Sequence, residues 1–293
     1  KFGVLAAGAV HRRTPAPPIP ISYRTPAQPL TTVQPSQCMV RSQSRLDSVI
    51  ENFCVDSQNV CFLSELKEEQ IADHLCESPS SVAFLGQESG RVCPEGISFE
   101  TRRGCLFIHA GSKVRRKGSK ARAGVFIALG PRFTRLWNTT GKLLSHSMRH
   151  VAIELRLSGH RICVASAYAP LSTSSSRLRS SFCSELASFA SDSTRSVIIG
   201  IDSNSSVGTG RHGLAESVGP HNLPHVNAAG RDFKDFLATH SLCLADTFYP
   251  KRNTLAMTPW VHPCTGQPDS LDHFITDAHT RTRHVLNCKK SAW

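Results

Sequence analysis

Short apolar runs of strand length recur along the chain, separated by turn-forming residues. One of them, residues 197–201, is apolar throughout, which is typical of a strand buried on both faces. Residues 150–157 and 161–168 alternate between apolar and polar positions around Gly159, and this pattern predicts a β-hairpin. Similar runs predict further strands at residues 60–63, 82–85, 105–109, 124–129, 242–246, 260–261 and 271–275.

Three segments carry apolar residues at helical spacing. In residues 178–190 an apolar side chain recurs every three or four positions, and residues 45–53 and 230–239 show the same period. Strands and helices therefore alternate, yet a hairpin also occurs. We expect sheets that contain both parallel and antiparallel strand pairs.

The composition is that of a globular protein with a proline-rich start. Of 293 residues, 40% are hydrophobic and 19% charged, which is enough for a substantial core. Residues 1–40 are predicted to be poorly ordered, so the folded domain is expected at 41–293. No apolar run approaches the ~18 residues that span a bilayer, so no membrane association is expected. The chain begins with Lys, which suggests a fragment of a longer reading frame.

The charge balance favours an acidic partner. The formal net charge is +12 and the pI about 9.4, and nucleic acid is the commonest partner of such a surface. A basic stretch between two predicted strands could bind a phosphate backbone, although a solvated loop is the simpler interpretation. Its candidate nucleic-acid-binding residues are Arg115, Arg116, Lys117, Lys120 and Arg122.

Cysteine and histidine spacing excludes two other classes of protein. None of the 11 cysteines is paired as C-x-x-C, and the 14 histidines include no H-E-x-x-H pattern. A disulfide framework and a structural zinc cage are therefore not predicted. Most thiols are expected to be buried in a reducing, intracellular compartment.

Polar residues that follow apolar strands are the candidate catalytic and metal-binding residues. Glu65, Asp202 with Asn204, and Asp272 each stand just past such a run or at its start. A rigid strand fixes the geometry of the side chain at its end, which suits a catalytic site. Solvated acids are also common at strand ends, and Asx residues in turns often cap the local backbone.

Four motifs in one order resemble a known superfamily. They are residues 62–65, 165–170, 198–208 and 270–275. Together they resemble the endonuclease/exonuclease/phosphatase superfamily, and more closely the apurinic-endonuclease-like domains of non-LTR retrotransposons and the related craniofacial development protein 2-like sequences. The resemblance implies a deoxyribonuclease I-like, four-layer α/β sandwich of two mixed sheets flanked by helices.

The resemblance also implies roles for individual residues. Glu65 would hold Mg²⁺ or Mn²⁺, and Tyr168 would contact the scissile phosphate or help stabilise the leaving group. Asp202 would position the attacking water, and Asn204 would bind the phosphate. Asp272 would orient a catalytic histidine through its ring N–H.

Three departures from the family pattern bear on activity. Gln34 stands where relatives usually have an asparagine, and it is one methylene longer. Serine follows Asn204 where relatives usually show alanine. The closing Ser-Asp-His motif is absent, because the chain stops at Trp293 near the expected start of that strand. The domain is therefore expected to be truncated at its C-terminus.

Two further residues have simpler interpretations. His273 follows Asp272 directly, but neighbours on a strand point to opposite faces, so both cannot enter one site. We expect His273 to occupy the family's aromatic position and to pack. Arg149 could approach nucleic acid, but packing is the simpler interpretation.

These observations predict a metal-dependent DNA endonuclease of retrotransposon type. By the resemblance, it would nick target DNA in the nucleus, and a longer parent chain would add a C-terminal reverse transcriptase domain. Two alternatives stay open. One is a decayed remnant that binds nucleic acid without cutting it. The other is a phosphatase or phosphodiesterase of the same superfamily that acts on a small molecule or a lipid headgroup.

Overall fold

The computed structural model places both sheets of the protein in the unit from Val33 to Trp293. Strand β1 (Ser36–Arg41) lies inside the segment that the sequence predicted to be poorly ordered, so the folded domain begins before residue 41. The structure describes residues 36–41, 52–114, 123–213, 216–250, 260–261, 266, 268–283 and 285–290.

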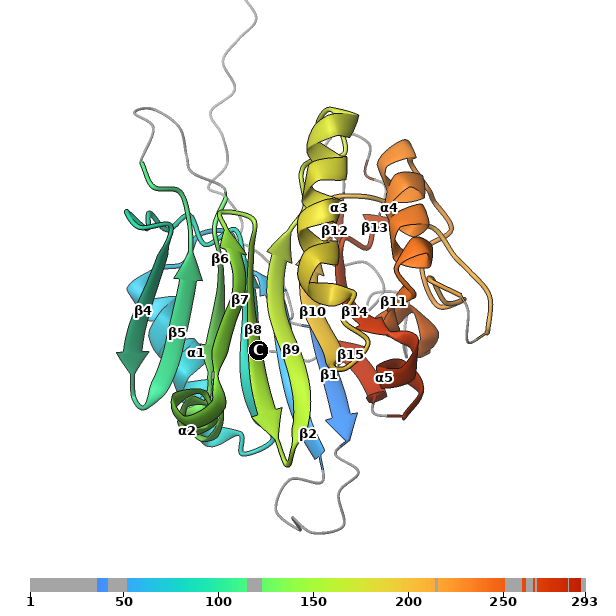
Figure 1. Cartoon of the computed structure of the whole chain (residues 1–293). Helices are drawn as coiled ribbons and strands as arrows, with labels where there is room; N and C mark the ends of the chain where they lie inside the picture. Colours follow the sequence, from blue (N-terminus) through green and yellow to red (C-terminus); the bar gives the residue numbers. More distant parts are fainter. Residues whose placement is uncertain are drawn as a thin grey trace, which may run out of the picture. The chain divides into compact units, whose positions relative to one another are not determined.

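The first sheet has seven strands in the order β15-β1-β2-β3-β6-β5-β4 (Figure 1). Its neighbours β2 and β3 run parallel, and every other adjacent pair is antiparallel, so the sheet is mixed. The bounds are β2 Asn52–Asn59, β3 Ser81–Gln87, β4 Ile97–Arg102, β5 Cys105–Ala110, β6 Val125–Leu129 and β15 Val285–Lys290.

The second sheet has six strands in the order β11-β14-β10-β9-β8-β7. It is also mixed, because β9 and β10 run parallel while their neighbours are antiparallel. A short ladder pairs β12 (Trp260–Val261) with β13 (Pro268–Asp269). The six bounds are β7 Lys142–Ser147, β8 His150–Leu157, β9 His160–Tyr168, β10 Ser196–Asp202, β11 Leu242–Leu244 and β14 Asp272–Asp277.

The helices pack on the outer faces of the two sheets and at their ends. Helix α1 packs on the first sheet, and α3 and α4 lie side by side on the second (Figure 1). Helix α2 contacts strands of both sheets. The bounds are α1 Glu65–Glu77, α2 Pro131–Thr140, α3 Ser176–Ala190, α4 Ala228–Thr239 and α5 Ala278–Arg283, with a 3₁₀ helix at Ala245–Phe248.

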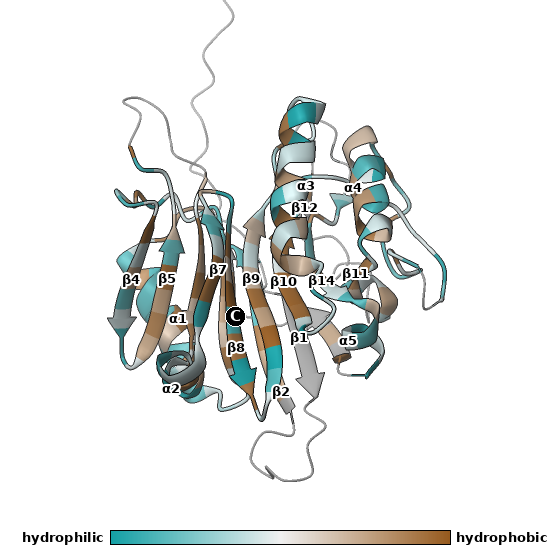
Figure 2. Cartoon of the chain, in the orientation of Figure 1, coloured by the Kyte–Doolittle hydropathy of each residue, from teal (hydrophilic) through white to brown (hydrophobic). Residues whose placement is uncertain are grey.

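Alternating side chains produce three apolar layers. On β3, Leu85 faces the second sheet while Phe84 faces α1. On β10, Ile198 points into the space between the sheets and Ile199 points toward α3 and α4. Both strands are therefore buried on both faces, and β9 and β10 carry long hydrophobic stretches (Figure 2). The four-layer α/β sandwich predicted from the sequence is confirmed.

Several local predictions need correction. Residues 60–63 form a connection between β2 and α1 and not a strand, and the acid after them begins a helix. The helix predicted at residues 45–53 lies largely outside the described residues, and its last position, Phe53, belongs to strand β2. The hairpin is confirmed, with Ser158 and Gly159 at its turn.

A layer of hydrogen bonds joins the two sheets near one end. The amide Nε2 of Gln87 lies 3.1 Å from Ser166 Oγ, 3.2 Å from Ser57 Oγ and 3.3 Å from the carbonyl oxygen of Gly200. The Ser166 hydroxyl donates to the Gly86 carbonyl at 2.8 Å. Gln87 and Ser166 are fully buried, so these bonds fix the separation and register of the sheets in a region without water.

Gly200 lets the two sheets approach each other at this layer. A Cβ at this position would overlap the side chain of Ser57 and come within 3.0 Å of Leu85 Cβ. We expect Gly200→Ala to lower the free energy of unfolding by about 1–3 kcal/mol, because the sheets must separate to admit the methyl group. The control is Gly130→Ala, whose Cβ would meet nothing closer than 3.4 Å. Denaturant unfolding of both variants tests this, and equal losses would contradict it.

Candidate active site

The ends of four strands bring polar residues from both sheets together. In the first sheet β2 ends at Asn59, and β3 ends at Gln87 directly before Glu88. In the second sheet β9 ends at Tyr168 and β10 ends at Asp202, opposite each other in the register. Each pair of strands is parallel, so the carboxyl ends of its two strands lie side by side.

Two hydrogen bonds connect these residues across the sheets. The side-chain amide of Asn59 donates to Asp202 Oδ2 at 2.8 Å. The hydroxyl of Tyr168 donates to Glu88 Oε1 at 2.7 Å. Each bond links one residue of the first sheet to one of the second, so the cluster forms only when both sheets are in place.

Asp272 and Asn204 complete the cluster. Asp272 begins β14 and stands directly opposite Asp202 in the antiparallel register. Asn204 adopts a φ of 46°, a left-handed conformation that asparagine tolerates better than most residues. Its backbone N–H donates to Asp202 Oδ1 at 3.0 Å, and its side-chain amide donates to the Ala169 carbonyl at 2.9 Å.

The environment of Asp202 disfavours its charged form. The residue is only 4% exposed. Burial raises the pKa of Asp202 to about 8, and the negative charge of Asp272 adds to the rise, while the hydrogen bonds from Asn204 and Asn59 oppose it. A carboxylate with a pKa near neutrality can accept a proton from water and release it again.

Tyr168 stays a neutral hydroxyl donor. Burial raises the pKa of Tyr168 well above its usual range, and the nearby carboxylate of Glu88 raises it further. Its ring is part of the core between the sheets, whereas its hydroxyl reaches the cluster. The side chain can therefore donate a hydrogen bond at a fixed position.

The connection from β2 to α1 is held against the site in an unusual backbone conformation. Cys61 and Phe62 both have positive φ, 45° and 86°. The Phe62 N–H donates to the Glu88 carbonyl at 2.8 Å, and the Lys67 ammonium donates to the Phe62 carbonyl at 3.0 Å. Residues held in sparsely populated φ/ψ regions persist only when their surroundings fix them, and they cluster at functional sites.

The structure brings together four of the predicted site residues: Tyr168, Asp202, Asn204 and Asp272. Glu65 does not join them. It lies exposed in the first turn of α1, and among the described residues its side chain has no hydrogen bond or ion pair. Outside the described residues lie Gln34, Arg115, Arg116, Lys117, Lys120 and Arg122, so their predicted roles stay predictions.

Asn59 and Glu88 are the site residues that the sequence reasoning missed. Glu88 directly follows a fully buried strand, which is the same signal that singled out Glu65. Asn59 ends β2, a strand whose buried polar residues obscure its pattern.

His273 points away from the cluster, as the alternation of strand side chains predicts. Its Nδ1 lies 3.1 Å from Asp246 Oδ2, and its Nε2 lies 2.9 Å from the Ser270 carbonyl oxygen. The ring is buried, so it does occupy a core position. Besides packing in the core, its ring makes polar contacts with Asp246 and with the Ser270 carbonyl.

The donors of the cluster suit a hard divalent cation. Glu88, Asp202 and Asp272 offer carboxylate oxygens, and Asn59 adds an amide. Mg²⁺ and Mn²⁺ prefer oxygen ligands and often keep several waters, so one or two carboxylates suffice. Burial and then the charge of Asp272 raise the pKa of Asp202, and a bound cation would relieve the repulsion between the two acids.

A second group of possible ligands lies elsewhere. Glu68, Glu100 and His109 place their ligand atoms within 4.8 Å of one another in the described part of the chain. Arg91 forms ion pairs with both glutamates, and Arg102 pairs with Glu68 at 2.8 Å. The two guanidinium groups already balance the acids, so this group is better described as an ion-pair network beneath α1 than as a metal site.

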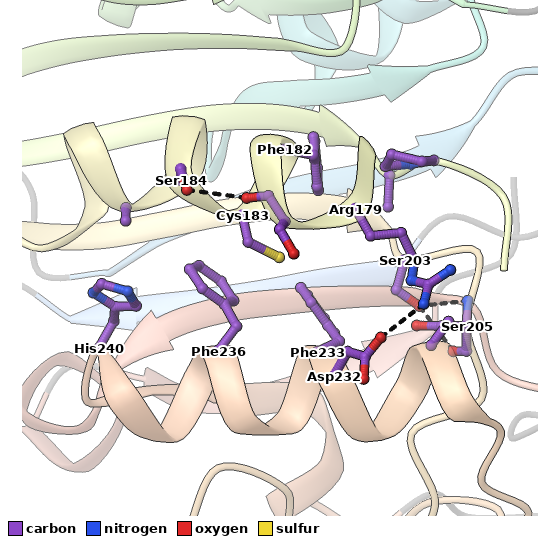
Figure 3. A pocket seen from close by; sticks show the side chains of 15 residues that line it. Arg179, Phe182, Cys183, Ser184, Ser203, Ser205, Asp232, Phe233, Phe236 and His240 are labelled. Atoms are coloured by element: carbon purple, nitrogen blue, oxygen red, sulfur yellow. Dashed lines mark hydrogen bonds and ion pairs between the residues drawn. The ribbon is translucent and has the colours of Figure 1, made fainter. Parts of the chain in front are cut away.

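A pocket lies between α3 and α4 (Figure 3), and none of the cluster residues lines it. It has a volume of roughly 350 Å³, and Phe182, Phe233 and Phe236 lie along its walls. Ser203 and Ser205 reach it from the same loop whose alternate residues, Asp202 and Asn204, serve the cluster. The pocket therefore lies behind the loop that follows β10, on the helix side of the sheet.

None of the described helices is long and apolar enough to cross a membrane.

Stability should depend on pH through Asp202. Because its pKa is raised on folding, the native state binds more protons than the unfolded chain between about pH 4 and pH 8, so Asp202 costs stability as pH rises. In metal-free buffer, Asp202→Asn should gain in Tm relative to the parent by about 2–8 °C between pH 5 and pH 9. Thermal unfolding measures this, with the exposed Asp235→Asn as control. A pH-independent difference would contradict it.

Comparisons with known proteins give matches of structure alone. No protein-family model matches the chain, and no relative was found among curated proteins. The endonuclease domain of TRAS1, a telomere-specific non-LTR retrotransposon, matches with 12% identity and a TM-score of 0.47, covering 77% of this chain and 85% of that one.

Two other solved structures are similar to a comparable degree. An endonuclease/exonuclease/phosphatase family protein from Leptotrichia buccalis matches with 14% identity and a TM-score of 0.49, over 76% of this chain and 86% of that one. A mannosyl-6-phosphatase of Bacteroides thetaiotaomicron matches with 12% identity and a TM-score of 0.44, over 77% and 85%. These values carry no conclusion about activity. The two facing mixed sheets, their strand order and the flanking helices form the deoxyribonuclease I-like, four-layer α/β sandwich expected from the sequence.

Proposed function

We propose that this chain is a divalent-metal-dependent phosphodiesterase that cleaves DNA as an endonuclease. One observation carries the proposal: residues far apart in the sequence meet where parallel strands of both sheets end. They combine a buried base, a neutral hydroxyl donor, amide donors and carboxylates suited to a metal. This set matches the needs of phosphodiester hydrolysis at one point.

The residues divide the chemistry between them. Asp202 would accept the proton of the attacking water, because its raised pKa makes it a base near neutral pH. Asn59 and the Asn204 backbone fix its two carboxylate oxygens through hydrogen bonds. The second amide hydrogen of Asn204 and the hydroxyl of Tyr168 would donate to phosphate oxygens as charge develops on them.

Glu88 and Asp272 would hold Mg²⁺ or Mn²⁺ beside the phosphate. The bound cation would neutralise charge on the phosphate and the leaving oxygen. This proposal moves the metal role from Glu65 to Glu88, and it places the family's asparagine at Asn59 in place of Gln34. The role of Asp272 toward a catalytic histidine stays a prediction.

The preference for DNA rests on charge and on motif order. The net charge of +12 favours a polyanionic substrate. The order of the motifs around Tyr168, Asp202 and Asp272 resembles that of retrotransposon endonuclease domains, and we propose this type of activity. Nuclear location and a reverse transcriptase domain in a longer parent chain follow from the same proposal.

Nicking of supercoiled plasmid tests the proposal. The parent chain should nick the plasmid with Mg²⁺ or Mn²⁺ and stop when EDTA is added, and Asp202→Ala should reduce the rate by about 100-fold or more. Plasmid binding without nicking would favour a non-catalytic nucleic-acid binder. Hydrolysis of p-nitrophenyl phosphate without nicking would favour a small-molecule phosphatase. Full activity of Asp202→Ala would refute the role of Asp202.

The same substitution at two glutamates separates the two possible metal positions. Glu88→Gln removes the carboxylate charge inside the cluster, whereas Glu65→Gln removes an exposed charge at the start of α1. We expect Glu88→Gln to lower the nicking rate by about 100-fold and to raise the Mg²⁺ concentration needed for half-maximal rate. Glu65→Gln should behave as the parent. A loss confined to Glu65→Gln would restore the original assignment.

A further inference from the structure

Arg149 lies beside the cluster in the turn between β7 and β8. Its carbonyl accepts the backbone N–H of Tyr168 at 2.8 Å, and its own N–H donates to Ser147 Oγ at 3.2 Å. The guanidinium lies over the Tyr168 ring, 5.8 Å from the centroid. One ring therefore separates this cation from Glu88, which the Tyr168 hydroxyl contacts.

The charge of Arg149 has no acidic partner in the described part of the chain. No carboxylate forms an ion pair with it there, and its Nε is buried without a hydrogen-bond partner. Among the described residues, its one side-chain hydrogen bond runs from Nη1 to the Tyr168 carbonyl at 3.4 Å. Burial lowers the pKa of Arg149, and Tyr168 and Glu185 offset this only in part. Glu185 itself lies 3.3 Å from His150 Nδ1.

Other shielded arginines of this fold differ in this respect. Arg195, with a side chain only 6% exposed, pairs with Glu154 at 3.1 Å, and Arg91 and Arg102 pair with Glu68. A desolvated cation without a counterion costs free energy, so its retention needs a compensating role. The compensation would come from an anion that the free protein lacks.

The acidic cluster needs a positive charge nearby if it is to bind a phosphodiester. The carboxylates of Glu88 and Asp272 repel a phosphodiester, and Arg149 places a cation over the ring of Tyr168, whose hydroxyl contacts Glu88. We propose that Arg149 binds a non-bridging phosphate oxygen of the substrate, next to the Tyr168 hydroxyl. This assignment rests on the proposed function, and it names Arg149 as a residue that binds the phosphate of the substrate. Guanidinium suits the task because it donates two parallel hydrogen bonds to phosphate and stays charged.

Binding of a labelled DNA duplex to the full chain in EDTA provides the test. Arg149→Ala should weaken binding about 10-fold or more and reduce the slope of log affinity against log salt by about 1, because one phosphate contact is lost. Arg149→Lys should recover part of the affinity. The control is Arg156→Ala, an exposed arginine near the opposite end of β8, which should keep the parent slope.

Thermal unfolding separates binding from a structural role. Arg149→Met removes the charge but keeps an apolar side chain over Tyr168, so without ligand its Tm should equal or exceed that of the parent. Addition of inorganic phosphate should raise the Tm of the parent and not that of Arg149→Met. A lower Tm for Arg149→Met together with an unchanged salt slope for Arg149→Ala would overturn the assignment.

Failure of this assignment can be told apart from failure of the proposed function. If the parent binds DNA through Arg149 but never nicks plasmid, cleavage is refuted and the phosphate contact stands. If the parent nicks plasmid and Arg149→Ala does so with unchanged KM and unchanged binding, the phosphate contact is refuted and cleavage stands. We expect KM to rise about 10- to 100-fold in Arg149→Ala, with a smaller change in kcat.

Discussion

The hydrogen bonds of Gln87 between the two sheets are the constraint on which the site depends. This one amide contacts Ser57 in its own sheet and Ser166 and Gly200 in the other. The next residue is Glu88, so the layer that sets the sheet separation also sets the position of a site carboxylate. Apolar packing alone would tolerate small shifts between the sheets, whereas a buried amide loses its partners if they move. The absence of a Cβ at Gly200 makes this separation possible.

The charged groups of the site are arranged in a way that lowers the stability of the fold. Asp202 is buried beside Asp272, which raises its pKa, and Arg149 lies nearby without an acidic partner. Opposite charges are thus present on both sides of Tyr168, yet in the described residues they do not pair with each other. In a structural ion-pair network, such as Arg91 with Glu68 and Glu100, the charges meet directly. Charged groups that do not neutralise each other are typical of sites that bind charged ligands, such as a phosphate and a cation.

The sequence predicted the second sheet better than the first for a physical reason. Strands β8, β9 and β10 are apolar or alternate cleanly, so Tyr168 and Asp202 could be placed at strand ends. Strand β2 carries buried Asp56 and Ser57, which hydrophobic patterning assigns to the surface. Oδ2 of Asp56 lies 2.9 Å from Nε2 of His74 in α1, a tertiary contact that no local pattern reveals. Because the pattern of β2 does not indicate a strand, it is the next apolar run, residues 60–63, that predicts one, with Glu65 as the acid at its end.

The error at residues 60–63 also shows how Asn59 and Glu88 are held together. Val60 and Leu63 are apolar because they are buried, but the backbone between them turns through two positive φ values at Cys61 and Phe62. That turn is fixed by N–H groups that donate to Glu88 and Ser89. The Asn59 side chain in turn accepts the Cys61 N–H at 3.0 Å. The turn therefore connects Asn59 and Glu88 directly. Its two positive φ values cost conformational free energy, and the contacts that hold the turn in this conformation also position these two site residues.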